Sequence, residues 1–60
     1  MITKSQQRAL LAVYRRADLG MSYLAFRRTA HVHYRLMGCV VMVPWCGMWL
    51  GIEADGTIHS

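Results

Sequence analysis

The spacing of hydrophobic and polar positions along the chain changes at Gly38. Before that residue, apolar side chains recur three and four positions apart, which is the spacing of a helix with one buried face. After it comes an apolar stretch rich in Val, Met and Trp, with the two-residue alternation that is typical of strands. This order predicts a small α+β domain in which two N-terminal helices pack on a C-terminal antiparallel sheet.

The first helix is predicted over residues 4–18. Thr3 and Gln6 have the spacing of a capping box, in which each side chain bonds the backbone N–H of the other residue. Gly20 suits the left-handed position just past the helix end. One apolar face is predicted for this helix, formed by Leu10, Val13, Tyr14 and Ala17.

The second helix is predicted over residues 22–37, with Gly38 as a natural stop. Met21 and Phe26 have the spacing of a hydrophobic staple at its start. Val32 lies between two histidines, and all three are indifferent helix formers. A break in the helix at this point is therefore the alternative.

Three strands are predicted, over residues 39–43, 48–53 and 57–59. Pro44 closes the first of them, because proline has no N–H to donate and is confined to strand ends and edges. The second and third strands are expected to form a hairpin.

The hairpin is predicted from the loop Ala54-Asp55-Gly56, which fits a type I turn with Gly56 in the left-handed bulge position. A three-residue loop places Ile52 opposite Ile58, so that both isoleucines lie on one face of the sheet. The polar neighbours then lie on the other face, and the turn agrees with the hydrophobic pattern.

The chain has 60 residues, and a single domain is predicted over residues 1–60. A domain of this size buries only about 60% of the surface that its unfolded chain exposes, so its stability is marginal. The composition, 55% hydrophobic and 17% charged, excludes a disordered tail.

Charge is distributed unevenly along the chain, whose formal net charge is +4. All seven Lys and Arg residues precede Leu36, and only Asp18 opposes them in that part. Basic side chains that contact phosphates supply most of the non-specific affinity for nucleic acid, which is the first predicted partner. The alternative is a solvated helix surface. The predicted nucleic-acid-binding residues are Lys4, Arg8, Arg15, Arg16, Arg27, Arg28 and Arg35.

Three sequence features together resemble a truncated winged-helix domain. They are Q-x-x-A-L-L at Gln6–Leu11, AFRRTA at Ala25–Ala30, and a strand-and-turn cadence in which Trp49, Ile52 and Gly56 match the returning strand and turn of the wing. The chain departs from that family by having room for two good helices where the family has three.

The resemblance implies that Arg27, Arg28 and Arg35 lie on a helix like the recognition helix of that family. Short basic chains of this kind also resemble small accessory proteins of tailed bacteriophages, which implies binding to a host or viral macromolecule and a regulatory role. The expected location is then the cytoplasm of a bacterial host, since the N-terminus has no uninterrupted apolar segment of the signal-peptide kind.

A second predicted function is docking on a larger assembly, or on a second copy, through an interface formed by Trp45, Met48 and Trp49. Methionine and tryptophan are frequent in such interfaces. In a regular strand, Trp49 faces away from Leu50 and Ile52, so we expect it on the outer face of the sheet.

Catalytic residues, metal ligands and cofactors are not predicted, and we do not expect an enzyme. The chain has three carboxylates and no nucleophile or phosphate-binding motif. The spacing of its potential zinc ligands is not that of a common structural zinc site, and the two histidines of H-x-H share a face only if that segment is extended. These potential ligands are His31, His33, Cys39, Cys46 and His59.

A small single-span membrane protein is the third possibility. Leu36–Ile52 has no charged side chain, and its length is at the lower limit for a spanning helix. Pro44, the glycines and the hairpin loop after this segment favour a sheet instead, so a membrane is not the expected partner.

Overall fold

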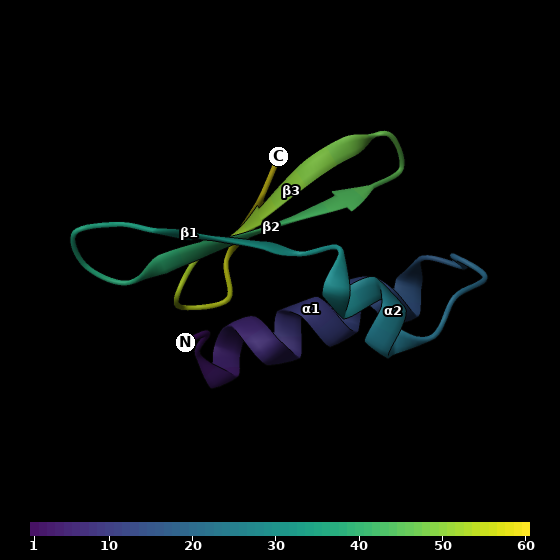
Figure 1. The fold of residues 1–60 in the computed structure, drawn as a ribbon, viewed down its shortest axis with the longest axis horizontal. Coiled ribbons are helices and arrows are strands. Elements are labelled where there is room, and N and C mark those ends of the chain that lie inside the picture. The colour runs from purple at the N-terminus through teal and green to yellow at the C-terminus, as the bar shows by residue number, and fades with distance from the viewer.

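The computed structural model describes all 60 residues and has an α+β architecture. Helix α1 spans Lys4–Arg16 and helix α2 spans Tyr23–Arg28. The strands are β1 (His31–Tyr34), β2 (Cys39–Trp45), β3 (Met48–Ile52) and β4 (Ile58–His59). They form one antiparallel sheet in chain order, and Figure 1 shows both helices on the same side of it.

The second predicted helix is wrong beyond Arg28, because the chain turns there and residues 31–34 form β1. The last turn of α2 tightens, with the N–H of Thr29 donating to Phe26 O (2.9 Å). Val32 then pairs with Val41 of β2. Valine packs well opposite valine on a pleated surface and is a poor helix former, so the strand is favoured once β2 is present.

The sheet has four strands where three were predicted, because β2 needs a partner on each edge. Cys39, Val40, Val41 and Val43 are all buried, so an unpaired edge would leave buried backbone groups without hydrogen bonds. Strand β1 supplies the second partner as far as Met42. Strand β2 does not end at Val43 but continues through Pro44. Beyond Met42, the edge of β2 that faces β1 has no partner strand, so the missing N–H of proline costs no hydrogen bond there.

The two remaining hairpins are set by residues in the left-handed region. Cys46 (φ 52°) and Gly47 (φ 76°) form the two-residue turn between β2 and β3, as a type I′ turn requires. The predicted β3–β4 hairpin is confirmed: Ile52 pairs with Ile58, and Gly56 has φ 91°. Hydrogen bonds from Thr57 to the Asp55 carboxylate lower the pKa of Asp55, so this turn loses support as pH falls through that pKa.

The core lies between the helices and one face of the sheet. Its seven buried apolar side chains are Leu10, Val13, Phe26, Val41, Val43, Leu50 and Ile52. Tyr14 ties the two helices together, since its hydroxyl donates to Met21 O (2.7 Å) and its ring lies against Phe26. Neither helix has the length and apolar character needed to cross a membrane.

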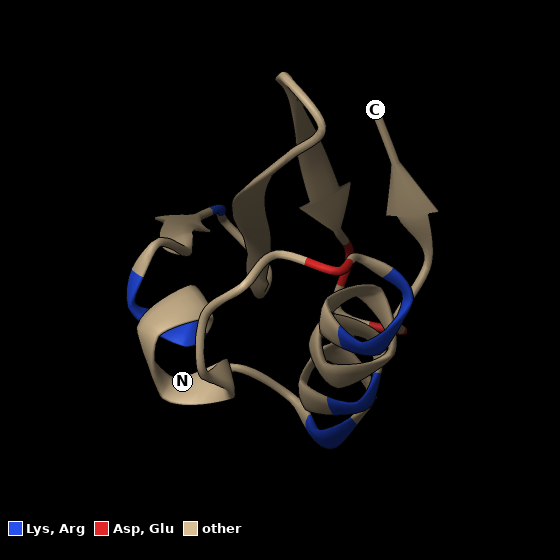
Figure 2. Ribbon diagram, turned by 90° about the vertical axis from the view of Figure 1, so that its right-hand side faces the viewer, with Lys and Arg blue, Asp and Glu red and all other residues tan.

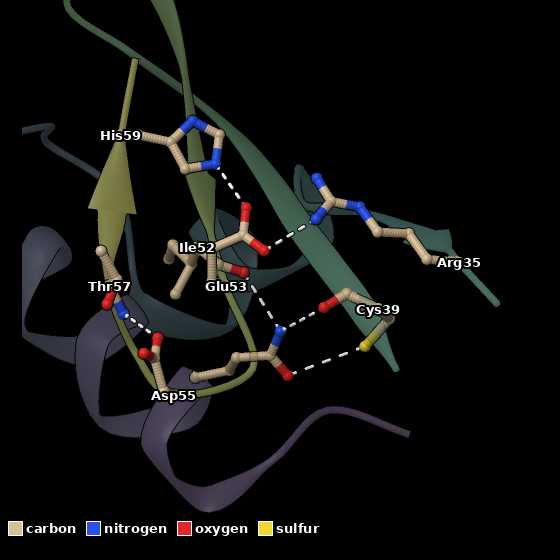
Figure 3. Close-up of polar contacts among 8 residues, drawn as sticks. Arg35, Cys39, Ile52, Glu53, Asp55, Thr57 and His59 are labelled. Atoms are coloured by element: carbon tan, nitrogen blue, oxygen red, sulfur yellow. Dashed lines mark hydrogen bonds and ion pairs between the residues drawn. The ribbon is translucent and has the colours of Figure 1, made fainter. Parts of the chain in front are cut away.

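Gln6 joins the start of α1 to two strands of the sheet. The predicted capping box with Thr3 is confirmed, and the Gln6 side chain is fully buried. Its Nε2 donates to the carbonyl oxygens of Cys39 (3.0 Å) and Ile52 (3.1 Å), while its Oε1 accepts from the N–H of Thr3 (2.8 Å). Figure 3 draws the two contacts with the strands as dashed lines that end on the carbonyl oxygens of Cys39 and Ile52.

We expect Gln6→Ala to lower the free energy of unfolding by about 2–3 kcal/mol, because two buried carbonyls lose their donor. For a chain of this size, the melting temperature should then fall by about 10–20 °C. Thermal and urea unfolding followed by circular dichroism would measure both. Gln7→Ala, at the exposed neighbouring position, is the control, and a Gln6→Ala result within about 0.5 kcal/mol of it would contradict the role of Gln6.

Candidate binding surfaces

One face of the sheet, here named the open face, is not covered by the helices. In antiparallel strands, alternate residues share a face, and the register places the outward residues of β1, β2 and β3 side by side. This face carries His31, His33, Val40, Met42, Trp49, Gly51 and His59, together with Arg35 and Glu53 just past the strand ends.

A shallow hollow of about 530 Å³ lies on the open face. Val40 and Met42 of the central strand are its most buried lining residues. Trp49, half exposed at 49%, meets the ring of His31 edge to face at a centroid distance of 5.6 Å. His33 and Arg35 complete the lining, so an apolar floor is bordered by an aromatic ring on β3 and by nitrogen-bearing side chains along the β1 hairpin.

Glu53 connects two strands and the β1–β2 turn at one end of the open face. Its carboxylate accepts from Arg35 Nη1 at 2.8 Å and lies 2.6 Å from His59 Nε2, as Figure 3 shows. All three side chains are partly exposed, and exposed ion pairs contribute at most about 1 kcal/mol. The contacts therefore orient Arg35 at the edge of the hollow more than they stabilise the fold.

The imidazole of His59 lies directly on Gly51, so a side chain at this position would have to displace the ring. A Cβ added at Gly51 would stand 2.5 Å from Cε1 and 2.8 Å from Nε2 of His59. Gly51 and His59 are paired in the sheet, and the ring crosses over Gly51 to reach Glu53.

We expect Gly51→Ala to displace the His59 ring and break its contact with Glu53. In a double-mutant cycle with His59→Ala, the two changes should couple by about 0.5–1 kcal/mol, since the clash disappears once the ring is absent. Urea unfolding of the four proteins would measure this coupling. Equal costs of Gly51→Ala with and without the ring would contradict the close contact.

The helices carry most of the cations on surfaces away from the strands, and Figure 2 shows these positions in blue on both helices. On α1, Lys4, Arg8 and Arg15 form a stripe opposite the buried side chains. Arg27 and Arg28 lie in the last turn of α2. Both ion pairs of the structure involve Glu53, so no helix cation has a carboxylate within ion-pair distance.

Arg35 is placed differently from the expectation that grouped it with Arg27 and Arg28 on one helix. It lies in the turn after β1, beside the open face, and is the one arginine that forms an ion pair. The predicted nucleic-acid-binding residues therefore lie in three places: the α1 surface, the end of α2 and the edge of the hollow.

The three predicted interface residues do not lie together. Trp49 is on the open face, as the alternation predicted, whereas Trp45 and Met48 belong to the other face. Trp45 lines an apolar groove of about 540 Å³ between α1 and the sheet, where its buried Nε1–H has no hydrogen-bond acceptor. The other lining residues are Ala12, Val13, Arg16, Leu50 and Ile58.

A further apolar surface is the tip of the β1–β2 hairpin, which extends to one end of the molecule in Figure 1. Leu36 and Met37 are fully or almost fully exposed there, and Tyr34 is 75% exposed. Tight turns usually present glycine or polar residues, so two large apolar side chains at a tip are unusual.

The potential metal ligands are dispersed over the fold. His31 and His33 do share a face, because the segment is extended, but no three His, Cys, Asp or Glu side chains are placed to hold one metal ion. Cys39 begins β2, Cys46 lies in the turn that follows this strand, and both cysteines are free.

Sequence reasoning missed the hollow because it placed residues 31–37 on a helix. Among its lining residues, His33 and Val40 belonged to neither the predicted basic surface nor the predicted interface. The signal that would have found them is the two-residue spacing of His31, His33 and Arg35, which puts all three on one face if the segment is extended.

No protein-family model matches this chain, and no curated protein or solved structure does either. Its function is therefore inferred from the arrangement of its own side chains.

Proposed function

We propose that this protein binds nucleic acid as a small accessory or regulatory protein. The observation that carries the proposal is the row of helix cations without acidic partners. Lys4, Arg8 and Arg15 share one exposed stripe of α1, and Arg27 and Arg28 end α2. A helix cation with no acidic partner breaks no ion pair when it approaches a phosphate, and it gains from the release of counterions.

The spacing of the α1 stripe also supports a polyanion as partner. Four- and seven-residue intervals on a helix correspond to about 6 and 10 Å along its axis, so successive cations reach successive phosphates of one backbone. A compact anion would engage only one of them. The proposal predicts affinity without strong sequence preference, because phosphate contacts do not distinguish bases.

The affinity should fall about 10- to 100-fold as salt rises from about 50 to about 200 mM, since roughly three phosphates would be neutralised. Fluorescence anisotropy with a labelled oligonucleotide would measure it. Arg8→Ala with Arg15→Ala should reduce the slope of log affinity against log salt by about 2.

Two further variants complete this experiment. Arg27→Ala with Arg28→Ala tests the end of α2 separately, and Gln7→Ala, an exposed uncharged position on α1, is the matched control. An affinity that does not respond to salt, or a slope that is the same in all variants, would contradict phosphate binding by the helices.

The exposed hairpin tip favours a second candidate function, as a structural component that associates with further copies of itself. Leu36 and Met37 form an apolar projection, and the groove beside Trp45 is apolar with an unpaired N–H donor. A tip that enters the groove of another copy would bury the apolar surface of both. Such a head-to-tail contact leads to closed rings or to open chains of molecules.

Leu36→Ser with Met37→Ser should abolish this association, and Met21→Ser, at another exposed methionine, should not. Sedimentation velocity over a wide concentration range would report the mass. A wild-type protein that remains monomeric at every concentration would rule out this candidate.

A further inference from the structure

We propose that the hollow on the open face binds an unpaired base of single-stranded nucleic acid, stacked on Trp49. This inference rests on the proposed function and narrows the ligand from nucleic acid in general to single-stranded nucleic acid. The cations on the helices attract any polyanion, whereas the hollow would distinguish a single strand from a duplex.

The shape and lining of the hollow fit a flat aromatic ring. Its volume of about 530 Å³ is within the range of small-ligand sites, about 300–1,000 Å³. Val40 and Met42 give an apolar floor, and Trp49 presents an exposed ring beside it. The edge-to-face contact with His31 fixes the orientation of the indole before any ligand arrives.

The border of the hollow supplies donors for the phosphates and base edges. His31, His33 and Arg35 alternate along the β1 hairpin, so their side chains follow one edge of the hollow. Glu53 engages Arg35 through Nη1, and the other N–H groups of the guanidinium remain free to donate. His59 holds Glu53 from the other side, which keeps Arg35 in place.

A duplex does not meet these requirements. Its bases are stacked on each other and paired, and their faces are not available to an aromatic side chain. Single strands present unstacked bases, and exposed aromatic residues on open sheets bind them with little sequence preference. An apolar floor, an exposed aromatic ring and a border of hydrogen-bond donors occur together on the open face. This combination favours an unpaired base over a duplex as the ligand.

The test compares a single-stranded oligonucleotide with the duplex of the same sequence, by anisotropy at low salt. We expect the wild type to bind the single strand at least tenfold more tightly. Trp49→Leu keeps an apolar side chain but loses the ring, and it should weaken single-strand binding roughly tenfold while leaving duplex binding unchanged. Trp49→Phe should retain most of the preference. Met48→Ala changes an exposed neighbour on the other face and is the matched control.

A second measurement does not depend on the Trp49 variants folding. In a Trp45→Phe protein, Trp49 is the one remaining tryptophan, and its fluorescence should be quenched by the single strand and not by the duplex. Equal affinity for both forms, or a preference that Trp49→Leu leaves intact, would overturn this inference while the proposed function stands. Absence of binding to either form would overturn both.

Discussion

The carboxamide of Gln6 is the contact on which the arrangement of the two layers depends. It satisfies a carbonyl on β2 and a carbonyl on β3 at the end where those strands stop pairing with each other, and it accepts the N–H of Thr3 at the start of α1. Apolar contacts between a helix and a sheet allow sliding, because the hydrophobic effect is not directional. A buried amide with three partners allows one position. It therefore fixes the axial position of α1 against the sheet, and the core side chains pack in that frame.

The same two-layer arrangement leaves the other face of the sheet without cover. The 60 residues form two layers, with both helices on the core face of the sheet. The side chains on the open face are instead ordered by one another: Trp49 by His31, and Arg35 by Glu53 and His59. Contacts of this kind contribute little to stability. Their effect is to hold an aromatic ring and a guanidinium in defined positions next to an apolar floor, as a binding surface requires.

Local signals in the sequence were sufficient for α1 and the β3–β4 hairpin. The capping box of Thr3 and Gln6 and the loop that ends at Gly56 each involve neighbours in the chain, and both form as the residues predict. Strand β1 was not predictable in this way. Arg27, His31 and Arg35 have helical spacing, while His31, His33 and Arg35 have strand spacing, so propensity alone does not decide between them. Residues 31–34 form a strand because the buried edge of β2 needs hydrogen-bond partners. This need arises only in the folded chain, where β2 is buried. The hollow was missed for the same reason, although Trp49 was correctly expected on the outer face of the sheet.

The position of β1 also relates the two surfaces that are proposed to bind one ligand. Strand order makes β1 an outer strand of the sheet, and it follows the end of α2 after two residues. Arg27 and Arg28 therefore lead directly into the strand whose His31 and His33 border the hollow. A nucleic-acid strand that crosses this edge would pass from the cations of α2 to the open face. Along this path it would stay in contact with side chains that are positively charged or can donate hydrogen bonds. The α1 stripe lies on the side of α1 opposite the core, where it would contact phosphates of a flanking part of the same strand and add to the positive potential around the protein. On this proposal the two surfaces would have different roles: the helices would raise the rate and strength of encounter, and the sheet would determine which form of nucleic acid remains bound.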